Sequence, residues 1–310
     1  MDGILVIDKP EGWTSHDVVA RARRLLREKR VGHTGTLDPF ATGVLVLLVG
    51  RATRLAQFLS GAEKEYEATV RLGHATDTGD LTGARLPGGG ADCASLTREG
   101  VEAALSSLRG EIEQVPPMYS AKKVGGKKLY ELARRGEEIE RKAVRVRVSE
   151  FEIVAVGGDA FILPGPEGTC DLRARVVCSA GTYVRSLAES LGGLLGTGAH
   201  LAALRRTRAG TSRIDDALTP EGLQQRIEAG TPAEEFLTPL EAALPEMPSA
   251  HLTAEDARKA RHGAAVPAPP GCSEGSHVRL LDERGSLLAV AVYDSARGRL
   301  QPRVMLAAEK

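Results

Sequence analysis

A polar, glycine-rich stretch that runs directly into a continuous apolar segment constrains this chain more than any other feature. Residues 32–43, GHTGTLDPFATG, combine three glycines and a proline with hydrogen-bonding side chains, which suit neither a helix interior nor a central strand. Residues 44–49, VLVLLV, predict a short strand that is buried on both faces. Loops held by such rigid elements often carry function, and Asp38 is the residue of this loop that we expect to be functional.

Hydrophobic periodicity predicts further strands and helices. Residues 3–7 predict a short buried strand, and residues 65–72 alternate as a strand with one buried face. A helix is expected after Ser15, which we take as its cap, and another over the apolar stripe at 184–195. Helices and strands alternate without a strict βαβ repeat, which is compatible with an α+β fold. The glycine-rich residues 87–91 predict an exposed, flexible tip.

The length of 310 residues favours one large and one small domain. Composition changes at residues 244–249, LPEMPS, which predicts a linker. We therefore assign residues 1–243 to the large domain and residues 250–310 to the small one. The small domain is expected to contain a short helix and three strands, the first two joined as a hairpin, at 253–262, 277–281, 286–293 and 299–306.

Overall charge does not identify a partner, because 41 Lys and Arg residues balance 41 Asp and Glu residues. Basic side chains nevertheless gather in three segments, at 21–30, 122–128 and 205–208. Each cluster alone is most simply a solvated face. Three clusters in one neutral chain make an anionic ligand such as RNA worth testing.

The cysteines and the apolar runs bear on compartment. No two cysteines have C-x-x-C spacing, which argues against a zinc knuckle or a redox dithiol, and scattered thiols suit a reducing cytoplasm. The N-terminus lacks a signal-peptide pattern, and no apolar run approaches the ~20 residues that span a bilayer. We therefore expect a cytoplasmic protein that does not enter a membrane.

Four polar side chains are candidates for chemistry, and each has a structural alternative. Asp38, which precedes Pro39, also suits a turn or an Asx cap. His33 could be a histidine bonded to backbone, and Tyr66 on its alternating strand could be core packing. Arg185, just inside a helix, would more often be a surface residue.

Several kinds of site can be weighed against these residues. His33 and Asp38 could ligate a metal, but no second histidine lies at i+4 and no H-E-x-x-H pattern occurs. The loop lacks the lysine of a phosphate-binding loop and precedes a strand rather than a helix, and the G-x-S-x-G elbow of hydrolases is absent. There remains an aspartate acting as nucleophile or general base, with an arginine that keeps it ionised.

Seven segments, taken in order, carry a specific resemblance. They are DKPEGWTSHD (8–17), GHTGTLDP (32–39), KEYE (64–67), TDTGD (76–80), PPMYSAKK with GKKLY (116–130), CSAGTYVR (178–185) and LRRT (204–207). Together they resemble the TruB family of pseudouridine synthases, which isomerise a uridine in the T-loop of tRNA. The resemblance covers residues 3–240. The C-terminal residues resemble, more weakly, a PUA-type RNA-binding domain.

The resemblance implies a fold and a reaction. The fold would be the α+β pseudouridine-synthase fold, with a mixed, largely antiparallel central sheet and a small C-terminal β-rich PUA-like domain. The substrate would be uridine 55 in the T-arm stem-loop of tRNA, flipped out for the reaction. Because no atoms enter or leave the nucleotide, no cofactor or metal is expected, and we expect a monomer without an obligatory protein partner. A tRNA-folding chaperone with secondary chemistry, or a related synthase acting on rRNA, are the alternatives.

The resemblance also implies catalytic roles. Asp38 would be the covalent catalyst, and whether it attacks the ribose, attacks the ring or takes a sugar proton stays open. Arg185 would keep that carboxylate charged and oriented, and Asp80 would support Arg185 from behind. Tyr66 would stack on the target base and could accept the proton from carbon 5.

Further residues would bind the RNA. Tyr183 and Leu204 would line the uracil pocket. His33 would help to extrude the uridine and occupy the stack that it leaves. The three basic clusters and the C-terminal domain are the expected contacts to the folded RNA loop.

Overall fold

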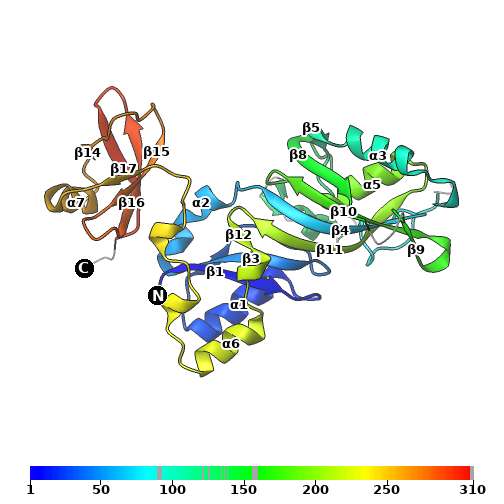
Figure 1. Ribbon diagram of the computed structural model, residues 1–310, viewed down its shortest axis with the longest axis horizontal. Helices are drawn as coiled ribbons and strands as arrows, with labels where there is room; N and C mark the ends of the chain where they lie inside the picture. Colours follow the sequence, from blue (N-terminus) through cyan, green and yellow to red (C-terminus); the bar gives the residue numbers. More distant parts are fainter. Residues whose placement is uncertain are drawn as a thin grey trace.

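The computed structural model describes residues 1–88, 93–120, 122–124, 126–133, 135, 137, 139–155 and 160–307. Its largest element is a ten-stranded sheet (Figure 1). The main path of this sheet runs in the order β1 (Gly3–Lys9), β3 (Thr42–Val49), β11 (Ala199–Ala209), β4 (Lys64–Leu72), β10 (Cys170–Cys178), β8 (Val144–Ile153) and β5 (Gly110–Gln114). The short strands β2 (Val31–His33), β9 (Leu163–Pro164) and β12 (Ser212–Arg213) pair with β3, β10 and β11.

The pairing within this sheet confirms the expected mixed, largely antiparallel arrangement. The strand pairs assigned in this sheet are antiparallel except β3 with β11, which run parallel over two residue pairs. The parallel junction joins the strand that follows the glycine-rich loop to a strand from the C-terminal half of the domain. It therefore brings residues far apart in the sequence to one place.

Strand β3 is buried on both faces, as predicted. Leu45 and Leu47 enter an apolar cluster that includes residues of α1 (Ser15–Leu26) and α6 (Pro220–Glu228). Val44 and Val46, which point to the opposite face, enter a second cluster. A strand packed on both sides cannot shift without opening a core, so the loop before it starts from a fixed point.

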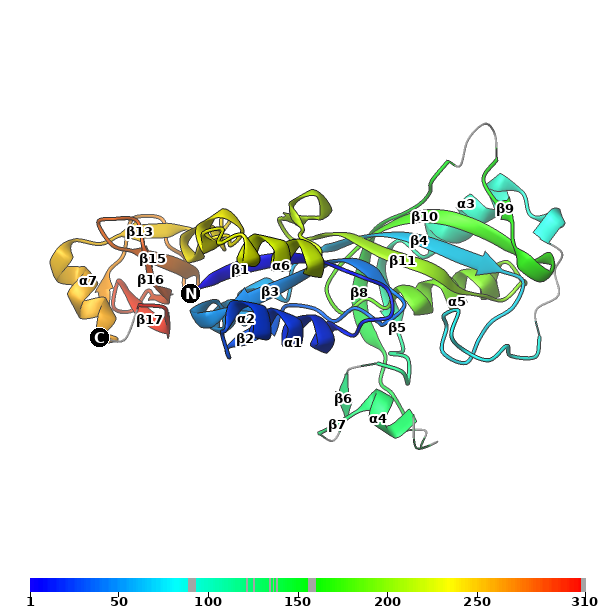
Figure 2. The same cartoon turned by 90° about the horizontal axis from the view of Figure 1, so that it is seen from below.

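Two further helices lie on the right-hand half of Figure 1, and a third extends from the body in Figure 2. α5 (Val184–Leu194) buries its apolar stripe, including Leu187 and Leu191, against β11. α3 (Arg98–Ser107) lies against β8 and α5. α4 (Leu129–Ala133), with the small hairpin of β6 (Lys123–Val124) and β7 (Lys127–Lys128), projects from the body (Figure 2).

The cap of α1 differs from the expectation by one residue. Thr14, not Ser15, is the N-cap, and its hydroxyl accepts from the amide of Asp17 while the Asp17 carboxylate accepts from the amide of Thr14. The three-residue spacing of Thr14 and Asp17 is that of a capping box, and this pattern would have identified Thr14 as the N-cap. Ser15 is the first helical residue, and its side chain is free to bond elsewhere.

The C-terminal residues form a separate five-stranded sheet, which confirms the expected β-rich domain. The order is β13 (Ser249–His251), β15 (His277–Leu281), β16 (Leu287–Asp294), β17 (Arg299–Met305) and β14 (Val266–Pro267), and α7 (Ala254–Arg261) packs on it. The predicted hairpin is β15–β16. The short α2 (Ala56–Leu59) lies between the two sheets in Figure 1.

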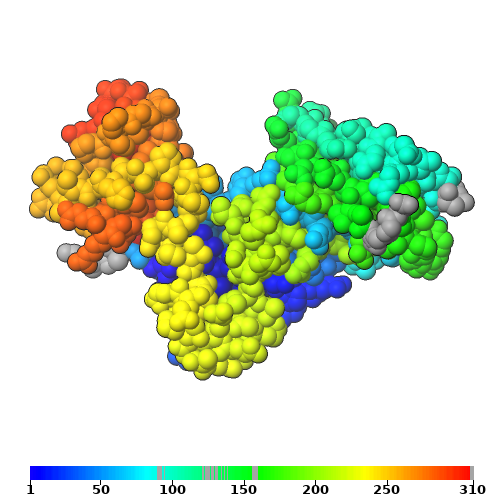
Figure 3. Space-filling model, viewed as in Figure 1, coloured from blue at the N-terminus to red at the C-terminus, as the bar shows by residue number. Residues whose placement is uncertain are grey.

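The two sheets are packed together. Leu240 and Leu244 lie in the same apolar cluster as Val46 of the large sheet and Leu287 of the small one. Figure 3 shows a broad hollow between the C-terminal part and the half of the molecule that carries β8 and β10. The predicted tip at 87–91 falls mostly outside the described residues. Within the described ranges, no helix combines the length and the hydropathy of a bilayer crossing.

Candidate functional site

The glycine-rich loop connects β2 to β3 and is closed by its own backbone. The Thr34 amide donates to the Val46 carbonyl at 3.1 Å, and the Ala41 amide donates to the Asp38 carbonyl at 3.1 Å. Gly43 has a φ of +99°, and a Cβ at this position would lie 2.2 Å from the carbonyl oxygen of Arg206. Only glycine permits both that conformation and that approach.

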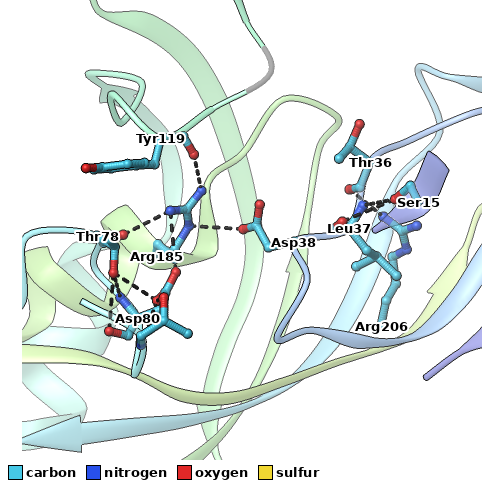
Figure 4. A network of polar contacts seen from close by, with 10 residues as sticks. Ser15, Thr36, Leu37, Asp38, Thr78, Asp80, Tyr119, Arg185 and Arg206 are labelled. Atoms are coloured by element: carbon cyan, nitrogen blue, oxygen red, sulfur yellow. Dashed lines mark hydrogen bonds and ion pairs between the residues drawn. The ribbon is translucent and has the colours of Figure 1, made fainter. Parts of the chain in front are cut away.

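Three buried side chains hold the loop from one side. Lys9, which is fully buried, donates to the Pro39 carbonyl at 3.2 Å and to two carbonyls of the preceding turn. The Ser15 hydroxyl donates to the Leu37 carbonyl at 3.1 Å and accepts from the Leu37 amide at 2.9 Å (Figure 4). The guanidinium of Arg206 donates to carbonyls at both ends of the loop. We call Lys9, Ser15 and Arg206 the backbone clamp.

The other side of the loop faces an ionic network. Asp38 Oδ2 lies 3.0 Å from Arg185 Nε, and Arg185 Nη1 lies 3.6 Å from Asp80 Oδ2 (Figure 4). Arg185 is buried and also donates to the carbonyls of Thr78 at 2.9 Å and Tyr119 at 2.6 Å. The guanidinium is thus fixed by two carboxylates and two backbone acceptors.

Asp80 is itself held by its own loop. Its Oδ1 accepts from the hydroxyl of Thr78 at 2.8 Å and from the hydroxyl and amide of Thr82 at 2.6 and 3.0 Å. The loop is tied to β11 by a bond from the Leu201 amide to the Gly79 carbonyl. Asp80 therefore presents one oxygen to Arg185 from a rigid support.

The electrostatics of Asp38 reflect both burial and charge. Burial raises the pKa of Asp38 above its ordinary value, and the charge of Asp80 adds to this shift. The Arg185 guanidinium and, less strongly, the Lys9 ammonium oppose it. The side chain of Asp38 keeps 34% of its exposure. The ion pair with Arg185 favours the charged carboxylate, which remains open to the adjoining cavity.

A cavity of about 290 Å³ adjoins Asp38. Five of the seven predicted site residues line it: Asp38, Tyr66, Tyr183, Arg185 and Leu204. Its volume is at the lower end of the range for ligand pockets, so it is suited to a small group such as a single base. The chain segments that meet here are the glycine-rich loop, β4, β11 and the start of α5.

The aromatic and apolar walls come from regular elements. Tyr66 lies on β4 and is buried, and burial raises the pKa of its phenol, so the ring is neutral at physiological pH. Leu204 lies on the neighbouring β11, opposite Ala68. Tyr183 caps α5, and its amide donates to Gln114 Oε1 at 3.0 Å.

The remaining two predicted residues lie outside the cavity lining. Asp80 lies behind Arg185, as expected of a supporting residue. His33 ends β2, and its ring meets that of His16 edge-on, with 5.8 Å between centroids. Burial and the neighbouring His16 lower the pKa of His33, which therefore carries a neutral imidazole at pH 7.

Sequence reasoning missed two cations of the cavity wall, Lys64 and Arg206. Lys64 is buried, and burial lowers its pKa to about 8. Its ammonium donates to the carbonyls of Ala62 at 2.6 Å and Ser60 at 3.2 Å. The alternation of side chains along a strand could have identified Lys64 as a site residue, since it lies on the same strand face as Tyr66.

The basic cluster at 205–208 is engaged within the protein. Arg206 is 2% exposed. Arg205 pairs with Asp8 at 2.7 Å, and Arg208 pairs with Glu63 at 2.9 Å. Acidic partners distant in sequence pair with two of these side chains and the fold buries the third, so the cluster is not the open solvated face that its composition alone suggests. In the cluster at 122–128, Lys122 lines the cavity, and the side chains of Lys123, Lys127 and Lys128 lie outside the described part.

Comparisons with known proteins point in one direction. The family model "TruB family pseudouridylate synthase (N terminal domain)" matches residues 23–184, and "tRNA pseudouridylate synthase B C-terminal domain" matches residues 185–245. Among curated relatives, tRNA pseudouridine synthase B of Geobacillus kaustophilus is 47% identical over 87% of this chain and 92% of its own length. The protein of the same name from Thermobifida fusca is 46% identical over 99% of each.

Solved structures share the fold. One, titled as an H/ACA RNP bound to a substrate RNA containing 2′-deoxyuridine, superposes with a TM-score of 0.72 at 24% identity, over 99% of this chain and 85% of that chain. Another, titled as a Cbf5-Nop10-Gar1 complex, has a TM-score of 0.70 at 27% identity, over 99% and 84%. The likeness extends over nearly all of this chain, so both sheets have counterparts there.

Proposed function

We infer, because the chain belongs to the TruB family of pseudouridylate synthases, that it isomerises uridine to pseudouridine at position 55 in the T-loop of tRNA. The observation that carries this proposal is the ion pair of Asp38 with Arg185 beside a cavity suited to one base. The relatives of 46–47% identity that cover most of this chain are named for tRNA, which supports the substrate class.

The reaction exchanges one glycosidic bond for another. The bond from uracil N1 to ribose C1′ breaks, the base turns within the cavity, and carbon 5 bonds to C1′. Carbon 5 then loses its hydrogen as a proton, and N1 gains a proton. Atoms and electrons balance within the nucleotide, apart from proton exchange, so no oxidant or other reagent is consumed. We propose that the Asp38 carboxylate is the covalent catalyst and that Arg185, supported by Asp80, keeps it charged and oriented.

The other walls would bind the base. The neutral ring of Tyr66 provides an aromatic face for stacking, which is worth ~1–3 kcal/mol per base. Tyr183 and Leu204 would contact the uracil edges, and His33, beside the loop, would occupy the stack that the flipped uridine leaves. Extrusion of a base costs a few kcal/mol, which these contacts would offset.

The division of the chain into domains, the place of the RNA, the oligomeric state and the cellular compartment are also proposals. We assign residues 1–243 to the catalytic domain and residues 250–310 to a PUA-like RNA-binding domain, in keeping with a second family match that ends at residue 245. The hollow in Figure 3 would accommodate part of the folded RNA. The exposed large apolar side chains among the described residues are single positions along the sequence rather than a continuous run, which supports a monomer acting without a protein partner. Buried thiols at Cys93 and Cys178 suit the reducing cytoplasm.

The test uses a T-arm stem-loop labelled with tritium at carbon 5 of its target uridine. The wild-type protein should release the label into water, and Asp38→Asn should reduce the rate by at least ~10⁴-fold while the RNA still binds. Turnover of Asp38→Asn close to wild type would contradict the catalytic assignment. Faster turnover of an rRNA fragment than of the T-arm would contradict the substrate assignment.

A further inference from the structure

We propose that Arg206 is a positioning residue that couples Tyr66 to the Asp38 loop during catalysis, a role that rests on the function proposed above. The proposal concerns a side chain that touches no predicted catalytic atom of Asp38.

Strand register places Arg206 between the two groups that it would couple. Strand β11 lies between β3 and β4 in the sheet. Arg206 pairs in parallel with Gly43, the last residue of the glycine-rich loop, and antiparallel with Tyr66. A Cβ on Gly43 would lie 2.2 Å from the Arg206 carbonyl oxygen, so the loop and β11 are in direct backbone contact. One residue is thus the cross-strand neighbour of both parts of the site.

The side chain of Arg206 also connects β11 to the glycine-rich loop. Arg206 Nε donates to the Val44 carbonyl at 2.7 Å, and Nη2 donates to the Gly35 carbonyl at 3.1 Å. Nη1 lies 3.5 Å from the Thr36 carbonyl, the long limit of a hydrogen bond. These acceptors lie on both sides of Asp38 in the sequence, so a single planar fork spans the loop. Arg206 also lines the cavity together with Tyr66, and its charge lowers the pKa of the Tyr66 phenol against the larger effect of burial.

The burial of Arg206 limits how far the glycine-rich loop can move away from β11. Arg206 is 2% exposed, and no carboxylate lies within ion-pairing distance of it in the described part of the chain. A buried cation without a counter-ion depends on its hydrogen-bond acceptors for stabilisation. Any movement of the loop away from β11 would break those bonds. We therefore expect the loop to move as one unit with β11, the strand that carries Arg206 and pairs with the strand of Tyr66.

The experiment compares Arg206→Lys with Arg205→Lys in single-turnover tritium release from the T-arm, with enzyme in excess. Lysine keeps the charge, but its single ammonium cannot reproduce the separate Nε, Nη1 and Nη2 donors that reach the carbonyls of Val44, Thr36 and Gly35. We expect the first-order rate constant of Arg206→Lys to fall by ~100-fold, because small misplacement of reacting groups costs rate on that scale, while the RNA Kd stays within about threefold. Arg205→Lys, on the same strand but paired with Asp8 at 2.7 Å, should keep the wild-type rate constant.

A double variant separates positioning from folding. In a Tyr66→Phe background the effect of Arg206→Lys should shrink, because the two residues act through one unit. If Arg206→Lys lowers only the amplitude or the melting temperature and leaves the rate constant unchanged, its role is structural and the proposal is overturned. Failure of both Arg206→Lys and Arg206→Gln to fold, with Arg205→Lys folded, would overturn it as well. If the wild-type protein itself releases no label, the proposed function has failed instead.

Discussion

The two sides of the Asp38 loop are built from different interactions. On one side, Arg185 lies between two carboxylates and acts on the side chain of Asp38 through charge, at 3.0 Å. On the other side, the backbone clamp of Lys9, Ser15 and Arg206 bonds to main-chain atoms rather than to a carboxylate of the site. Figure 4 shows Ser15 and Arg206 on this side of the loop. The first side mainly sets the protonation of Asp38, to which the charge of Lys9 adds a weaker contribution, and the second side mainly sets its position.

This difference separates two requirements of a reactive carboxylate. A charge must be stabilised where it is needed, and its carrier must be held within a fraction of an ångström. In this molecule the two tasks fall mainly to separate residues, so variants of Arg185 and Asp80 on one side and of Ser15 and Arg206 on the other should differ in their pH dependence as well as in size of effect.

Removal of Arg185 should have the largest effect. Arg185→Met leaves Asp38 without its counter-charge and Asp80 buried without a cation, and we expect kcat/KM to fall by about 10³-fold. Because Arg185 lowers the pKa of Asp38, its loss raises that pKa further. As the pH falls, the carboxylate would then be protonated at a higher pH than in the wild type. The acidic limb of the pH–rate profile should therefore move to higher pH.

The control for this variant is Arg175→Met. Arg175 also pairs with two carboxylates, Glu65 and Glu150, but on the open face of the sheet, where it is 38% exposed. Its loss should leave the acidic limb in place. An Arg185→Met profile with an unmoved limb would show that the ion pair does not set the protonation of the reactive group.

Asp80→Asn should have a smaller effect with the opposite pH signature. Asparagine can still accept from Thr78 and Thr82, so the loop should keep its shape, while Arg185 loses one of its two carboxylates. We expect kcat to fall by about 10- to 100-fold through poorer orientation of Arg185. Since the charge of Asp80 raises the pKa of Asp38, its removal lowers that pKa and should move the acidic limb to lower pH. A limb that moves upward would contradict the charge network described here.

Much of this architecture was predictable from local pattern. The apolar run at 44–49 specified a strand buried on both faces, because no polar position interrupts it, and the C-terminal hairpin followed from alternation around a turn. Asp38 stood out because a loop of glycines and a proline leads directly into that strand. The capping error at Ser15 came from two adjacent residues that both suit an N-cap, of which serine is the more strongly preferred.

The cations of the site could not be predicted in the same way. Lysine and arginine are mostly exposed, so sequence alone favours a solvated face for Lys9, Lys64 and Arg206. Their burial depends on which strands pair and in which register, and the β3–β11 junction joins residues more than 160 positions apart. Five of the seven predicted residues meet in one cavity, whereas the side chains that hold the loop in place depend on that long-range pairing.

The smallest expected effect is that of Ser15→Ala, and it tests the clamp side most cleanly. The variant removes one hydroxyl and leaves the amide and carbonyl of Leu37 without their buried partner, which should destabilise the protein by about 1 kcal/mol. Because these bonds flank Asp38, the single-turnover rate constant should also fall, by less than about tenfold, with no change in the acidic limb.

Thr14→Ala is the matched control, since it acts on the same helix end. Loss of the N-cap should also cost about 1 kcal/mol, but Thr14 bonds to Asp17 and not to the loop. Two variants of equal stability would then differ in rate constant only if the Ser15 bonds position Asp38. Equal rate constants for both would mean that Ser15 does not position Asp38. The two buried cations of the clamp, Lys9 and Arg206, would then hold the loop by themselves.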